Sequence, residues 1–94
     1  MITSKERAKL RAQANELQPI FQLGKEGITP NFIEGVDQAL ENRELIKISL
    51  LENCELDVRE ACNTVSERTK AEQIQCIGRR FVLYRKSKKK DAKK

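Results

Sequence analysis

The sequence contains no histidine and no tryptophan, and its only aromatic residues are three phenylalanines and one tyrosine. Without histidine, serine–histidine–aspartate triads, histidine general bases and histidine-containing metal sites are excluded. Base stacking is a poor means of holding single-stranded nucleic acid here, because it needs several exposed rings. No apolar run approaches membrane-spanning length, and residues 1–12, MITSKERAKLRA, lack the apolar stretch of a signal peptide. We therefore expect a cytoplasmic protein without a membrane partner.

Cysteines are few and irregularly spaced. Cys54, Cys62 and Cys76 are odd in number, and their spacings of eight and fourteen residues match no zinc or redox pattern. We interpret them as small hydrophobic residues in a reducing compartment, with Cys62 in the core. The sequence predicts no metal, no cofactor, no small-molecule substrate and no catalytic residue, and hence a protein that is not an enzyme.

The net charge of +5 is unevenly distributed along the 94 residues. Residues 85–94, RKSKKKDAKK, hold seven basic residues and one acid, whereas the other 84 residues hold 12 basic and 13 acidic residues. We predict one nearly neutral domain over residues 1–85, large enough for a modest core. Residues 86–94 are predicted to be a basic, disordered tail. Such tails attract polyanions, nucleic acid first and acidic membrane surfaces second.

Helix and strand patterns alternate along the predicted domain. The predicted elements are a helix from a Thr3–Glu6 capping box to about Leu17, a strand over Ile20–Leu23, a helix with Thr29 as N-cap and Pro30 in its first position, a strand over Leu45–Leu51, a helix opened by an Asp57–Glu60 capping box, and strands over Gln73–Ile77 and Arg80–Arg85 joined at Gly78-Arg79. This order, α-β-α-β-α-β-β, predicts a single compact α/β domain with a mixed four-stranded sheet packed with three helices.

Two helices carry charged faces whose meaning the sequence leaves open. Four bases of the first helix either form a solvated face or turn toward phosphates; they are Lys5, Arg7, Lys9 and Arg11. The second helix carries an acidic ridge of Glu34, Asp37 and Glu41, which we interpret as a solvated face rather than a metal or catalytic cluster. Gly35 lies at the edge of the apolar face of that helix and indicates a close approach by a neighbour.

The segment between the first strand and the second helix is Gly24-Lys25-Glu26-Gly27. A G-x-x-G pair alone is a weak signal, but backbone N–H groups and the helix dipole at such a junction suit an anion. The glycines let a phosphate backbone approach closely, and Lys25 adds a positive charge at the tip. KH-type modules use a GxxG loop to clamp a nucleic-acid backbone. The alternative is a strand-to-helix turn without a ligand.

Two nucleotide-binding motifs also place glycines after a strand. The Rossmann pattern needs a third glycine, but Ile28 and Thr29 follow Gly27. A P-loop needs serine or threonine after its lysine, but Glu26 follows Lys25. Neither nucleotide-binding motif is present.

Three blocks in order, LQPIFQLGKEGITPNF, RELIKISLLEN and IGRRFVLYR, resemble the YhbY family of small bacterial proteins, which are stand-alone CRM (chloroplast RNA splicing and ribosome maturation) domains. The resemblance covers about Thr3 to Arg85. It implies an RNA-binding α/β fold similar to the C-terminal domain of a translation initiation factor. It also implies binding to precursor large-subunit ribosomal RNA, association with the ribosomal particle and a role in ribosome assembly.

By position, the resemblance implies that the RNA-contacting loop is Gly24, Lys25, Glu26 and Gly27, and that Arg79, Arg80 and Arg85 lie on a basic surface. The bases of the first helix would extend that surface. Glu26 departs from the small or uncharged residue that we expect beside phosphates. The alternative function is a protein-interaction adaptor on the assembling ribosome, whose RNA contact through the basic tail is incidental.

Overall fold

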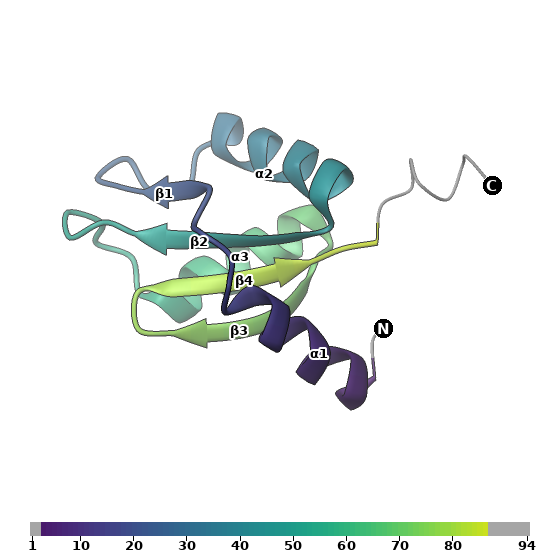
Figure 1. The fold of residues 1–94 in the computed structure, drawn as a ribbon. Helices are drawn as coiled ribbons and strands as arrows, with labels where there is room; N and C mark the ends of the chain where they lie inside the picture. The colour runs from purple at the N-terminus through teal and green to yellow at the C-terminus, as the bar shows by residue number, and fades with distance from the viewer. Residues whose placement is uncertain (1–2, 87–94) are drawn as a thin grey trace.

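Three helices and four strands follow one another in the predicted order in a computed structural model that describes residues 3–86 (Figure 1). Their bounds are α1 Ser4–Ala14, β1 Phe21–Leu23, α2 Pro30–Arg43, β2 Leu45–Leu50, α3 Val58–Thr69, β3 Glu72–Ile77 and β4 Arg80–Tyr84. The α/β fold class and the element order are confirmed. Residues 87–94, which make up most of the predicted tail, lie outside the described residues.

The four strands form one mixed sheet in the order β1-β2-β4-β3. β1 runs parallel to β2, and β4 runs antiparallel to both β2 and β3. Helices α2 and α3 cover one face of this sheet, and α1 lies on the other face (Figure 1). Of the helices in residues 3–86, none has both the length and the hydropathy needed to cross a bilayer.

The core follows from the pleat of β2, in which buried and half-buried residues alternate. Ile46, Ile48 and Leu50 face α2 and α3, and Phe81 and Leu83 of β4 join them there. A smaller cluster on the opposite face holds α1 against the sheet; its buried members are Ala14, Ile74 and Val82. Gly35 of α2 packs against Phe21, since a Cβ there would lie 3.3 Å from the ring. This confirms the predicted close approach.

Most local signals are confirmed, with two adjustments. The Thr3–Glu6 capping box opens α1, and Thr29 caps α2. However, α1 ends at Ala14 rather than near Leu17, because the backbone changes to i→i+3 hydrogen bonds after Ala14. Pro19 follows soon after, and proline disfavours a helical conformation in the residue that precedes it. Asp57 does cap α3, but its carboxylate accepts from the backbone N–H of Arg59 at 3.0 Å instead of forming the expected box with Glu60.

The acidic ridge on α2 is not simply solvated, which corrects the interpretation of Asp37 and Glu41. Arg85, just after β4, donates to Asp37 Oδ1 at 2.5 Å and to Glu41 Oε1 at 3.2 Å. Its guanidinium also donates to the backbone carbonyl of Thr69 at 2.7 Å. With a side chain only 17% exposed, Arg85 ties the end of β4 to both α2 and α3.

Replacing Arg85 with alanine should lower the free energy of unfolding by about 1–3 kcal/mol, because it leaves partly buried acceptors without their donor. Urea denaturation followed by circular dichroism measures this loss. Arg43→Ala is the matched control: Arg43 is exposed at the end of α2, and its loss should change stability by less than about 0.5 kcal/mol. Equal effects of the two substitutions would contradict the structural role of Arg85.

Candidate nucleic-acid interface

Three connections that are far apart in the sequence lie at the same end of the strands, along one edge of the sheet. β1 and β2 are parallel, with Leu23 opposite Leu50, so the segments that follow them leave the sheet at the same edge. The β3–β4 turn reaches the same edge, because Arg80 at the start of β4 pairs with Ser49 near the end of β2. Figure 1 shows the three connections at the left-hand end of the strands. We call this end the loop edge.

The Gly24–Gly27 loop is a tight turn, in which the Gly27 N–H donates to the Gly24 carbonyl at 3.0 Å. Gly27 has a φ of +69°, a conformation that costs residues with a Cβ about 1–2 kcal/mol. Lys25 and Glu26 form the exposed tip. The sequence therefore needs glycine at Gly27 for the backbone alone, whether or not the loop binds a ligand.

The N-terminus of α2 offers fewer free donors than the sequence suggested. Thr29 Oγ1 accepts from the N–H of Phe32 at 3.1 Å, and the Thr29 carbonyl accepts from the N–H of Ile33 at 3.0 Å. Pro30 has no N–H at all. An anion at this junction would therefore depend on the helix dipole, the loop amides and Lys25 more than on the first turn of α2.

A cleft of about 390 Å³ borders the loop on the side of α3. Its lining residues are Lys25, Glu26, Gly27, Ile28, Glu55, Leu56, Thr64 and Arg68. Arg68 lies in the last turn of α3, and sequence patterns gave no indication that it lines a cleft beside the loop. Two bases and two acids line this cleft, so its net charge is balanced.

Arg79 connects the β3–β4 turn to the segment after β2. Its Nε donates to the Leu50 carbonyl at 3.3 Å, and its Nη2 donates to the Leu51 carbonyl. A guanidinium has five N–H donors, so donors remain for a ligand at the loop edge. Arg80 is exposed, and within residues 3–86 its side chain has no ion pair.

The bases of α1 lie on the other face of the sheet from α2 and α3. Arg7 donates to the backbone carbonyl of Gln73 on β3, whereas Lys5, Lys9 and Arg11 are exposed. The structure thus brings Gly24–Gly27, Arg79 and Arg80 together at the loop edge. It places α1 elsewhere, and it places Arg85 at the opposite end of β4, in the ion pairs described above.

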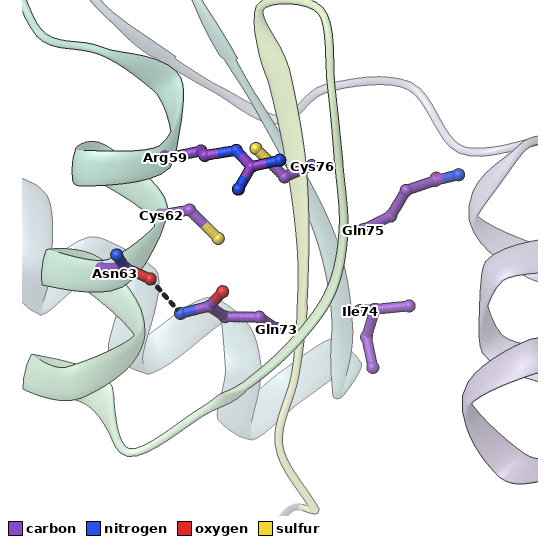
Figure 2. A pocket seen from close by; sticks show the side chains of 7 residues that line it. All are labelled: Arg59, Cys62, Asn63, Gln73, Ile74, Gln75 and Cys76. Atoms are coloured by element: carbon purple, nitrogen blue, oxygen red, sulfur yellow. Dashed lines mark hydrogen bonds between the residues drawn. The ribbon is translucent and has the colours of Figure 1, made fainter. Parts of the chain in front are cut away.

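A second cleft, of about 300 Å³, lies between α3 and the edge strand β3 (Figure 2). Cys62 of α3 and Cys76 of β3 line it, beside a hydrogen bond of 2.6 Å from Gln73 Nε2 to Asn63 Oδ1. Burial raises the pKa of the Cys62 thiol to about 12, and Cys76 contributes a smaller effect in the same direction. A thiol that stays protonated at neutral pH is a poor nucleophile, so Cys62 is not an activated cysteine. In residues 3–86, no three cysteine, aspartate or glutamate side chains are close enough to share a metal ion.

Comparison with known proteins identifies the family. Residues 2–85 match the CRS1 / YhbY (CRM) domain. A Bacillus subtilis protein named "Probable RNA-binding protein YqeI" is 43% identical over 94% of this chain and 92% of its own length. A Haemophilus influenzae protein named "RNA-binding protein" is 33% identical over 92% of this chain and 87% of its own length.

A solved structure has the same fold. It is the solution structure of a Staphylococcus aureus protein described as a candidate RNA-binding protein. The two chains are 48% identical, with a TM-score of 0.78 over 94% of this chain and 92% of the other. From the matched domain and these relatives, we conclude that the chain belongs to the CRS1/YhbY (CRM) domain family.

Proposed function

We propose that this protein is a cytoplasmic, non-enzymatic RNA-binding factor that binds precursor large-subunit ribosomal RNA and assists ribosome assembly. The observation that carries the proposal is the meeting of the Gly24–Gly27 loop, Arg79 and Arg80 at one edge of the sheet. Relatives of similar length that are named RNA-binding proteins support RNA as the partner. The ribosomal target rests on the family resemblance.

The loop suits a phosphate backbone better than a base. Lys25 presents a cation at an exposed tip, and the neighbouring glycines have no Cβ that would hold a phosphate backbone away. Contacts of this kind position RNA without reading its sequence. Glu26 shares the tip, so we propose that phosphates pass on the Lys25 side and that Glu26 lowers affinity for the loop modestly.

Lys25→Ala should weaken binding to single-stranded RNA by a similar factor for different sequences, because phosphate contacts carry no sequence information. The slope of log affinity against log salt should become shallower by about 0.7, the value of one phosphate contact on a single strand. Fluorescence anisotropy at several salt concentrations measures both. Arg43→Ala removes the same charge from the end of α2 remote from the loop and should leave the slope nearly unchanged. A changed base preference in Lys25→Ala would show that the loop reads bases.

Deleting residues 86–94 separates RNA binding by the domain from an adaptor role. We expect the shortened protein, crosslinked in cells, to retain fragments of large-subunit ribosomal RNA, because the loop edge lies within residues 3–85. Sequencing of the crosslinked RNA and mass spectrometry of co-purified proteins provide the two measurements. Loss of all RNA together with retained ribosomal proteins would favour the adaptor. Scattered messenger fragments in the full-length protein would contradict the ribosomal target.

Cys62 should behave as a structural thiol rather than a nucleophile. At pH 8, iodoacetamide should modify it much more slowly in the folded protein than in urea, because a pKa of about 12 leaves little thiolate. The folded pKa lies above the ordinary value of 9.0, so this thiol stabilises the fold below pH 9 and loses that effect as pH rises toward 12. The free energy of unfolding of Cys62→Ala should therefore fall less than that of the original protein as pH rises from 9 toward 12. Equally fast modification in the folded and unfolded protein would reveal an activated cysteine.

A further inference from the structure

Part of the sheet face that carries α1 is not covered by that helix. α1 packs on Ile74 of β3 and on three residues of the neighbouring strands, Leu45, Val82 and Tyr84. Leu45 and Tyr84 lie at the ends of β2 and β4 that are remote from the loop edge, and Val82 lies in the middle of β4. Figure 1 shows the segment from α1 to β1 crossing the sheet in front of β4 and β2, with the strands continuing beyond it to the loop edge. The remaining surface between this crossing and the loop edge we call the open face.

The pleat and the register determine which residues form the open face. On β2, Lys47 and Ser49 alternate with the buried Ile46, Ile48 and Leu50, and therefore point away from α2 and α3. Arg80 pairs with Ser49 and with Ile77, so it lies on the same side. The residues of the open face are Gln22, Lys47, Ser49, Gln75, Ile77 and Arg80.

An irregularity in β3 adds Gln75 to this surface. The register of β3 against β4 shifts between Gln73 and Gln75, and Gln75 pairs with Val82 of the α1 cluster. Figure 2 shows Ile74 and Gln75 on one side of β3, with Cys62 and Gln73 on the other. Two successive side chains therefore face the α1 side, as a β-bulge allows.

The open face is positively charged although the folded domain is nearly neutral. It contains a hollow of about 140 Å³ lined by Asn15, Lys47, Gln75, Ile77, Arg80 and Val82, with two cations and no acid. Within the described residues, neither Lys47 nor Arg80 has an ion pair. This differs from the cleft beside Gly24–Gly27, where Glu26 and Glu55 offset the bases.

We propose that the open face is a second RNA-binding surface, across which a single strand held at the loop edge continues toward α1. This inference rests on the proposed function. Lys47 and Arg80 are diagonal neighbours on paired strands, roughly 7–8 Å apart at their backbones, and they bind phosphates of the same strand. The amides of Gln22 and Gln75 donate to and accept from base edges. Ile77, whose exposed fraction of 63% is the highest of the large hydrophobic residues described, gives an apolar contact.

Charge and position favour RNA over a protein as the occupant. Two unpaired cations without an acid in the hollow complement a polyanion. The surface is continuous with the loop edge, because Arg80 follows directly after Arg79 of the β3–β4 turn. It also lies between the loop edge and Asn15, which follows the last turn of α1. An RNA strand on the open face therefore runs from the loop edge toward the C-terminal end of α1.

The inference is tested with single-stranded RNAs of two lengths. The probes are fluorescein-labelled single-stranded RNAs of mixed sequence, one of about 16 nucleotides and one of about 4, which bracket the site sizes of small nucleic-acid domains. For Lys47→Gln, which leaves Arg80 of the loop edge intact, we expect the affinity for the long RNA to fall about threefold and its salt slope to become shallower by about 0.7, the value of one contact. Affinity for the short RNA, which the loop edge accommodates, should change little.

The controls separate this inference from the proposed function. Lys25→Ala should weaken binding of both RNAs, and Arg43→Ala should weaken neither. Lys47→Arg, which keeps the charge, should retain the affinity for the long RNA, and unchanged thermal unfolding shows that each variant is folded. If Lys47→Gln binds the long RNA like the original protein, the open face is not an RNA surface, while the Lys25 result still tests the loop. If it instead loses a protein partner with RNA affinity unchanged, the inference is equally overturned.

Discussion

The pairing of β2 with β1 on one side and β4 on the other is the constraint on which the rest of the structure depends. Parallel pairing with β1 sends the Gly24–Gly27 loop to the edge where β2 ends. Antiparallel pairing with β4 brings the β3–β4 turn to the same edge. The two-residue period of β2 then divides its side chains between a buried face and a partly open one. A slip of one residue would put Lys47 into the core and Ile48 into water, so the hydrophobic effect fixes the register strongly.

Because the domain is nearly neutral, the position of each lysine or arginine matters more than the number of these residues. Arg85 and Arg80 are both at the ends of β4, yet the protein uses them differently. Arg85 contacts α2 and α3 and donates to two carboxylates and two backbone carbonyls, so most of its donors are satisfied within the fold. Arg80 has no such partner in residues 3–86. The charge of Arg80 can therefore attract a polyanion over a distance of roughly one Debye length.

Local signals allowed the sequence to predict the elements, and non-local contacts explain what it missed. The cap at Thr29, the alternation in β2 and the glycine turn at Gly78 all involve neighbours within a few residues, so one sequence suffices to recognise them. The strand and helix patterns on either side of the GxxG loop placed it correctly between β1 and α2. Arg85 meets Asp37 across 48 residues, and Arg79 reaches Leu51 across 28, and no periodicity indicates such pairs. The β3 irregularity was missed for the same reason, because it depends on the partner strand.

An RNA surface made of separated cations has consequences that a single strong pocket would lack. Each exposed base contributes little alone, because water and salt screen it well. Several lysines and arginines that contact one RNA strand add their contributions, because the first contact has already removed most of the freedom of that RNA strand, as in linked binding sites. In the proposed RNA surface, Glu26 at the loop tip would limit the binding of short or unrelated anions there, and Lys47 and Arg80 would compensate when the RNA is longer. On this proposal, the spacing of these cations would favour extended RNA over free phosphate.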